Sequence, residues 1–123
     1  MSHYMSHYFD SPTLGLVKLV RDGIPQQIRA RGGQEKILFI PPAERVPALL
    51  AKLREEVREA LAAKGDAALA EELADITEVI KAIEDILWLE LGVVGKGKRQ
   101  RLGRFSEFFA LRAADVEAWK ARP

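Results

Sequence analysis

The sequence predicts an all-α fold, an antiparallel helical bundle, from two observations. Apolar residues recur at spacings of three and four over residues 44–64 and again over residues 67–91, which is typical of amphipathic helices. The connection between the two stretches is only about two residues long, so the helices are expected to pack as an antiparallel hairpin. A chain of 123 residues suits one domain. We therefore expect a single helical domain over residues 14–123.

The first residues contain Met-Ser-His-Tyr twice, at positions 1–4 and 5–8, which indicates a duplicated start. We expect residues 1–13 to be disordered or an extension outside the fold. Both histidines, His3 and His7, lie in this segment, and the chain has no cysteine. Any metal site in the folded part is therefore expected to use oxygen ligands and to bind a hard cation such as Mg²⁺ or Mn²⁺.

Short elements are expected before the first long helix. Pro25 can occupy the first position of a short helix, which would end at Gly32 and Gly33. Residues 36–40, KILFI, are β-prone and stop at two prolines, so they are expected to form a short strand or an extended segment.

The ends of the two long helices are marked by local signals. Pro47 is compatible with the first long helix only in its first turn, and Gly65 ends that helix. Asp66 is a suitable N-cap for the second long helix, and Gly92 is expected to stop it.

The C-terminal part has weaker signals. Residues 92–104 are rich in glycine and basic residues, which indicates a loop or a weak helix. The aromatic residues 105–111 are expected to form a strand or a turn packed on the bundle, and residues 113–120 a short terminal helix.

Composition excludes several classes of protein. The net charge of +1 gives no reason to expect binding to nucleic acid or to a membrane. No apolar run approaches the roughly 20 residues that a transmembrane helix needs, and no secretory signal is visible. The absence of cysteine fits a reducing cytoplasm. We expect a cytoplasmic protein.

Acidic residues cluster at helical spacing on both long helices. Glu56 and Glu59 are three residues apart, as are Glu72 and Asp75, so each pair shares one face of its helix. In an antiparallel hairpin the two pairs can face each other, and four converging carboxylates repel one another unless cations neutralise them. The alternative is a solvated acidic face, in which Glu55 pairs locally with a basic neighbour such as Lys52 or Arg58.

Three motifs occur in a recognisable order. They are KLVRDGIP at 18–25, EEVRE followed by ELAD at 55–59 and 72–75, and KRQRLGRF at 98–105. This order resembles the MazG-like, all-α nucleoside triphosphate pyrophosphohydrolase superfamily. The first motif is similar to the KLVRDxIP opening of its "phosphoribosyl-ATP pyrophosphohydrolase-like" branch of house-cleaning enzymes.

The resemblance implies a Mg²⁺-dependent enzyme that splits a nucleoside triphosphate into a monophosphate and pyrophosphate, and a homodimer or higher homo-oligomer. It implies metal ligands at Glu56, Glu59, Glu72 and Asp75. It implies catalytic roles for Glu55, Glu56 and Glu59, and substrate contacts from the basic residues Lys18, Arg21, Lys98 and Arg101. For Arg21 an alternative stays open, a structural ion pair with Asp22.

Our hypothesis is metal-assisted hydrolysis, in which Mg²⁺ bridges carboxylates and triphosphate and activates a water, and basic side chains stabilise the developing charge. Glu55 or Glu59 could orient the water. Two alternative functions stay open. One is the phosphoribosyl-ATP step of histidine biosynthesis, and the other is a non-catalytic helical module that binds a nucleotide or a protein partner.

Overall fold

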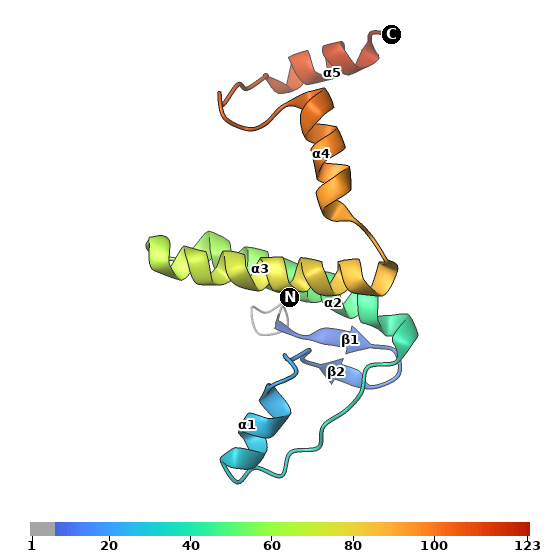
Figure 1. Ribbon diagram of the computed structural model, residues 1–123, viewed down its shortest axis with the longest axis vertical. Coiled ribbons are helices and arrows are strands. Elements are labelled where there is room, and N and C mark those ends of the chain that lie inside the picture. Colours follow the sequence, from blue (N-terminus) through green and yellow to red (C-terminus); the bar gives the residue numbers. More distant parts are fainter. Residues whose placement is uncertain (1–6) are drawn as a thin grey trace. The chain divides into compact units, whose positions relative to one another are not determined.

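The computed structural model describes residues 7–123, which are mostly helical with one small sheet (Figure 1). The elements in chain order are β1 (Phe9–Ser11), β2 (Gly15–Val17), α1 (Ile24–Ala30), a 3-10 turn (Pro42–Glu44), α2 (Arg45–Ala62), α3 (Asp66–Leu87), α4 (Leu91–Leu102) and α5 (Ala113–Ala121). The predicted helical character is confirmed, but the structure also contains a two-stranded sheet, which the all-α prediction did not include. Within this described range, no helix is both long and apolar enough to cross a membrane.

The chain divides into two compact units, Met1–Leu89 and Glu90–Pro123. We describe each unit by itself. The single domain expected over residues 14–123 and the complete helical bundle therefore stay predictions.

Helices α2 and α3 form the predicted antiparallel hairpin in the first unit (Figure 1). Pro47 lies in the first turn of α2, where its missing N–H removes no helical hydrogen bond. Gly65 has φ +90° and is the N-cap residue of α3, so Asp66 is the first residue of the helix rather than its cap. The left-handed conformation of Gly65 allows the tight reversal between the two helices.

The hairpin has a small core. Ala48 and Leu49 of α2 and Val79 of α3 are the buried apolar residues of the described chain. Two charged side chains of α2, Glu55 and Glu56, are buried as well. A buried carboxylate is costly unless it has polar or charged partners. Such partners are therefore expected around Glu55 and Glu56.

A two-stranded antiparallel sheet precedes the helices. Phe9 of β1 pairs with Val17 of β2, and Ser11 with Gly15. The turn between the strands is held by Ser11, whose Oγ accepts hydrogen bonds from the backbone N–H groups of Thr13 (3.2 Å) and Leu14 (2.9 Å). Residues 9–11 thus form a strand within the stretch that was expected to lie outside the fold.

The sheet is attached to the beginning of α2. Ser11 Oγ donates a hydrogen bond to Glu44, and Thr13 Oγ1 donates one of 2.5 Å to the other oxygen of the same carboxylate. Strand β1 also packs against α2. These contacts bring the N-terminal segment, with His7, to the side of α2. Residues 1–6, which include His3, lie outside the described residues.

The short helix α1 agrees with its prediction. Pro25 lies in its first turn, and Gly32 follows its end with φ +82°. Residues 36–40 form neither a strand nor a helix, so the predicted strand is not observed. They lead into the 3-10 turn at Pro42–Glu44, which begins where the two prolines were expected to end the segment.

The end of α3 differs from its prediction. Helix α3 ends at Leu87, and the next residue, Trp88, adopts a left-handed conformation with φ 55°. Gly92 is therefore not a stop signal but the second residue of α4. Glycine adopts helical dihedral angles at a cost in conformational entropy of about 0.5–1 kcal/mol relative to alanine, so a glycine by itself does not end a helix.

The second unit contains α4 and α5. Helix α4 corresponds to the weak-helix alternative for residues 92–104, and α5 confirms the predicted terminal helix. Residues 105–111 between them form neither a strand nor a helix. Phe105 and Phe109 are exposed on the second unit, and the packing of this aromatic stretch on the bundle stays a prediction.

Candidate functional site

Three of the four predicted metal ligands converge in the hairpin. Carboxylate oxygens of Glu56, Glu59 and Glu72 all lie within 4.8 Å of one another. Glu56 and Glu59 share a face of α2 because they are three residues apart. The antiparallel course of α3 then brings Glu72 opposite them. We call these three residues the acidic cluster.

Proximity changes the proton affinity of the acidic cluster. Desolvation, followed by its contacts with the carboxylates of Glu56 and Glu59, raises the pKa of Glu72 to about 7. Burial raises the pKa of Glu56, and the negative charge of Glu59 acts in the same direction. Without a cation, Glu56 and Glu72 therefore hold protons more tightly than isolated glutamates do.

The donor set of the acidic cluster suits a hard cation. Two buried oxygens, Oε2 of Glu56 and Oε2 of Glu72, have no hydrogen-bond partner within residues 7–123. A buried polar atom without a partner is costly in a native protein. A cation bound between the helices would satisfy both oxygens. Because the ligands are carboxylates only, Mg²⁺ and Mn²⁺ fit them better than softer metals.

Asp75, the fourth predicted ligand, has a different partner. Its Oδ1 accepts a hydrogen bond of 2.6 Å from Nη2 of Arg21. Arg21 thus forms its ion pair with Asp75 and not with Asp22, which was the structural alternative. Asp75 remains close to the acidic cluster, since its charge contributes to raising the pKa of Glu56.

Glu55 lies among cations. Oε2 of Glu55 is 3.2 Å from Nζ of Lys52, and Oε1 is 3.5 Å from Nζ of Lys18. Burial alone would raise the pKa of Glu55, but Lys52, the hydrogen bond with His7 and the charge of Lys18 outweigh it, so the pKa is lowered. Of the two local partners considered from the sequence, Lys52 is the one that the structure places beside Glu55. Lys52 also lies 3.5 Å from Glu56.

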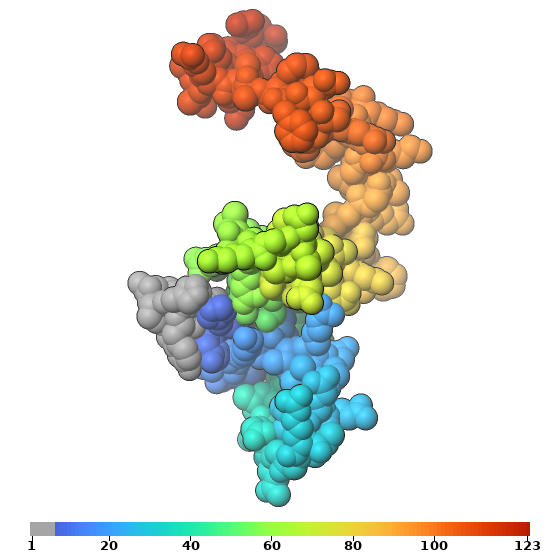
Figure 2. All heavy atoms as spheres, turned by 90° about the vertical axis from the view of Figure 1, so that its left-hand side faces the viewer, coloured from blue at the N-terminus to red at the C-terminus, as the bar shows by residue number. Residues whose placement is uncertain are grey.

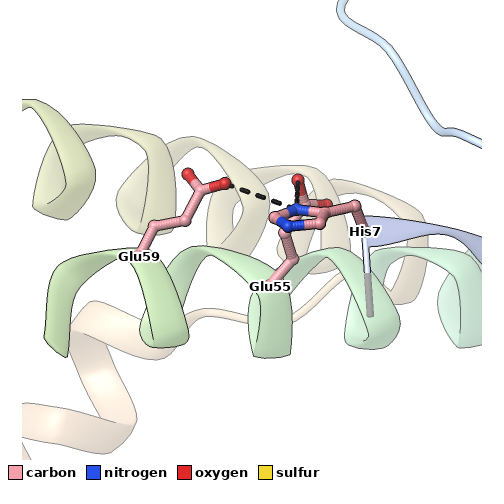
Figure 3. A group of neighbouring side chains, drawn as sticks. All are labelled: His7, Glu55 and Glu59. Atoms are coloured by element: carbon pink, nitrogen blue, oxygen red, sulfur yellow. Dashed lines mark hydrogen bonds and ion pairs between the residues drawn. The ribbon is translucent and has the colours of Figure 1, made fainter. Parts of the chain in front are cut away.

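His7 is the site residue that the sequence reasoning missed. Its Nδ1 lies 3.3 Å from Oε1 of Glu55 and 3.6 Å from Oε1 of Glu59 (Figure 3). His7 was set aside with the duplicated start, and no sequence pattern links it to α2. Lys52, by contrast, could be found from its spacing, because it lies three and four residues before Glu55 and Glu56.

A cavity of about 610 Å³ adjoins these charged residues. Its wall is formed by the segment 18–24, by α2 and by α3, which lie against one another in the first unit (Figure 2). The charged lining residues are Lys18, Arg21, Asp22, Lys52, Glu56, Asp75 and Glu78. Glu56 therefore belongs both to the acidic cluster and to the cavity wall. The volume is sufficient for a small-molecule ligand.

The two basic residues predicted to bind phosphate in the C-terminal part lie on α4. Lys98 and Arg101 are three residues apart, so they project from the same face of this helix, and both are exposed. They belong to the second unit. Their contact with substrate stays a prediction.

The chain was also compared with known proteins. No family model, no curated protein and no solved structure matches it. The resemblance of the sequence motifs to those of MazG-like enzymes therefore stays a prediction.

Proposed function

We propose that this protein is a Mg²⁺-dependent nucleoside triphosphate pyrophosphohydrolase of the MazG-like, house-cleaning type. The observation that carries the proposal is the acidic cluster beside the cavity. Two buried carboxylate oxygens of the cluster have no hydrogen-bond partner within residues 7–123, and a hard cation would satisfy both. The adjoining cavity has Lys18, Arg21 and Lys52 in its wall, and these side chains can attract the oxygens of a triphosphate.

Glu56, Glu59 and Glu72 would hold the cation, and Asp75 lies within reach as a further carboxylate. When bound, Mg²⁺ supplies neutralising charge for the triphosphate and lowers the pKa of a coordinated water. The pair of Arg21 and Asp75 joins the two sides of the cavity. Arg21 is therefore positioned to turn from the carboxylate toward a phosphate.

The hydrolytic step needs one water. Its oxygen forms a bond to a phosphorus of the anhydride between the α and β phosphates, and the bridging P–O bond breaks. The nucleoside monophosphate and pyrophosphate leave, and the proton of the water passes to a carboxylate. We assign the orientation of this water to Glu59, because Glu55 is held by Lys18 and Lys52 and has a lowered pKa.

We also propose that the protein forms a homo-oligomer. Several large apolar side chains of the hairpin are exposed, including Leu50 (52%), Leu61 (83%) and Leu73 (49%). Exposed apolar surface on a small helical hairpin is typical of an interface, and a second copy would bury it. Light scattering after size-exclusion chromatography should give a mass of at least twice 13.7 kDa. A monomer at micromolar concentration would contradict this proposal.

The test of the enzymatic function is pyrophosphate release from a panel of canonical and modified nucleoside triphosphates and phosphoribosyl-ATP, with Mg²⁺ and with EDTA. Metal-dependent release of pyrophosphate and a monophosphate is the expected result. Carrying out the reaction in ¹⁸O-water shows which product receives the water oxygen, and hence which phosphorus is attacked. Turnover of phosphoribosyl-ATP alone would favour the histidine-pathway function. Binding of nucleotide without turnover of any compound would contradict the enzyme and favour a binding module.

A further inference from the structure

His7 lies beside two carboxylates of α2 in an arrangement that the proposed function does not use. In Figure 3, dashed lines join Nδ1 of its imidazole ring to the carboxylates of Glu55 and Glu59. The three donor atoms lie within 4.8 Å of one another. His7 is separated from Glu55 by 48 residues along the chain, so only the fold creates this group.

The distances between the donor atoms fit a shared cation. Zinc-type ions bind imidazole nitrogen and carboxylate oxygen at about 2.0–2.2 Å, so neighbouring ligand atoms in a tetrahedral site lie about 3.4 Å apart. Nδ1 of His7 is 3.3 Å from Glu55 and 3.6 Å from Glu59. A cation could therefore enter with little movement of the three side chains.

The charge around the two carboxylates differs. Lys18 and Lys52 both lie beside Glu55, and Nζ of Lys18 is 3.5 Å from Oε1, the oxygen that also faces His7. Glu59 belongs to the acidic cluster as well as to the group with His7, and within the described residues its only ion-pair partner is His7. A cation bound beside His7 would therefore be drawn toward Glu59.

We propose that His7, Glu55 and Glu59 form a binding site for a divalent cation of the zinc class, such as Zn²⁺ or Co²⁺. The imidazole nitrogen separates this site from the carboxylate-only acidic cluster, because imidazole suits borderline metals and Mg²⁺ prefers oxygen. Three protein ligands leave a fourth position for water, as in open zinc sites. The site shares Glu59 with the acidic cluster, but its existence does not depend on the proposed hydrolase function.

The test is a titration of the metal-free, full-length, untagged protein with Co²⁺, followed by its visible absorption, and with Zn²⁺ by calorimetry. His7→Ala should weaken binding of both ions by at least about 10-fold to 100-fold, because loss of a direct ligand costs more than loss of a group that only supports one, and should weaken the Co²⁺ absorption band at matched Co²⁺ concentration. His3→Ala is the matched control, because His3 occupies the same position in the repeated tetrapeptide. It should bind both ions like the unchanged protein.

Unchanged affinity in His7→Ala would overturn the proposal, as would an equal loss in His3→Ala, which would show binding by the N-terminal segment alone. If His7→Ala folds poorly by circular dichroism, NMR of the unchanged protein decides. Substoichiometric Co²⁺ should then shift or broaden the imidazole signals of His7 before those of His3. Pyrophosphate release with Mg²⁺, measured separately, reports on the hydrolase proposal, so failure of one proposal is distinguishable from failure of the other.

Discussion

The two units of the chain differ in how their charged side chains are held. In the first unit, the charged residues of α2 contact groups that come from distant parts of the sequence, such as Lys18 and His7. In the second unit, neither α4 nor α5 contains a buried residue. Acidic side chains outnumber basic ones in residues 1–89, and the opposite holds for Glu90–Pro123.

This difference shows which parts of the candidate site are fixed by packing. The acidic cluster is positioned by the hairpin of α2 and α3, by its small core and by the attachment of the sheet through Glu44. Helix α4 contains no buried residue, so its own helical spacing sets which of its basic side chains share a face.

The largest effect is expected from Glu72→Gln. This change removes a charged ligand from the acidic cluster, so Mg²⁺-dependent pyrophosphate release should fall by about 100-fold or more. Glu71→Gln is the matched control, because Glu71 is the preceding residue of α3 and is exposed. Steady-state kinetics of pyrophosphate release, at Mg²⁺ concentrations up to saturation, measure the activity of both variants. Equal activity in the two variants would contradict the assignment of the metal ligands.

A smaller effect is expected when the charges of α4 are removed. The double variant Lys98→Ala with Arg101→Ala should raise the KM for the triphosphate by about 10-fold, since a hydrogen bond to a charged group contributes about 1.5–3 kcal/mol. The double variant Lys120→Ala with Arg122→Ala removes the same charge from the same unit and should leave KM nearly unchanged. Identical KM values in both double variants would remove α4 from the substrate contacts.

The raised pKa of Glu72 predicts a pH dependence of stability in the metal-free protein. Between its ordinary value of 4.5 and about 7, the folded state holds a proton that the unfolded state has released. Stability should therefore fall as pH rises through this window and level off above about pH 7. Urea unfolding in the presence of EDTA, repeated at several pH values, measures this change in the free energy of unfolding.

In the same pH series, Glu72→Gln should flatten the dependence, because the variant side chain does not titrate. Added Mg²⁺ should restore stability at the upper end of the window, where the carboxylate is ionised. A stability that rises with pH over this window, in EDTA, would show that the acidic cluster is not the dominant titrating group.

The smallest effect is expected from the exposed pair of Arg21 and Asp75. Exposed ion pairs contribute about 0.2–1 kcal/mol, so Arg21→Ala should lower the free energy of unfolding by no more than this amount. Arg29→Ala serves for comparison, because Arg29 binds the backbone carbonyl oxygens of Gly33 and Glu35 and lies outside the cavity wall. A rise in the KM for triphosphate in Arg21→Ala alone would support a phosphate contact.

Much of the secondary structure could be predicted because its signals are local. Pro25 at the beginning of α1 and Gly65 between α2 and α3 each act through their own backbone conformation. The predicted end of α3 was wrong, because a glycine at position 92 is compatible with the end of one helix or with the beginning of the next. Trp88 adopts the left-handed conformation that sequence rules reserve for glycine, and no local signal announces it.

For the candidate site, helical spacing was enough to predict that Glu56 and Glu59 share one helix face and that a short connection joins their helix to the one that carries Glu72. The partners of the charged groups were not predictable in this way. Asp75 pairs with Arg21, and His7 lies beside Glu55, because of how distant segments pack. Helical spacing fixes neighbours three and four residues apart, whereas contacts over 48 or 54 residues depend on how the N-terminal segment packs on the hairpin.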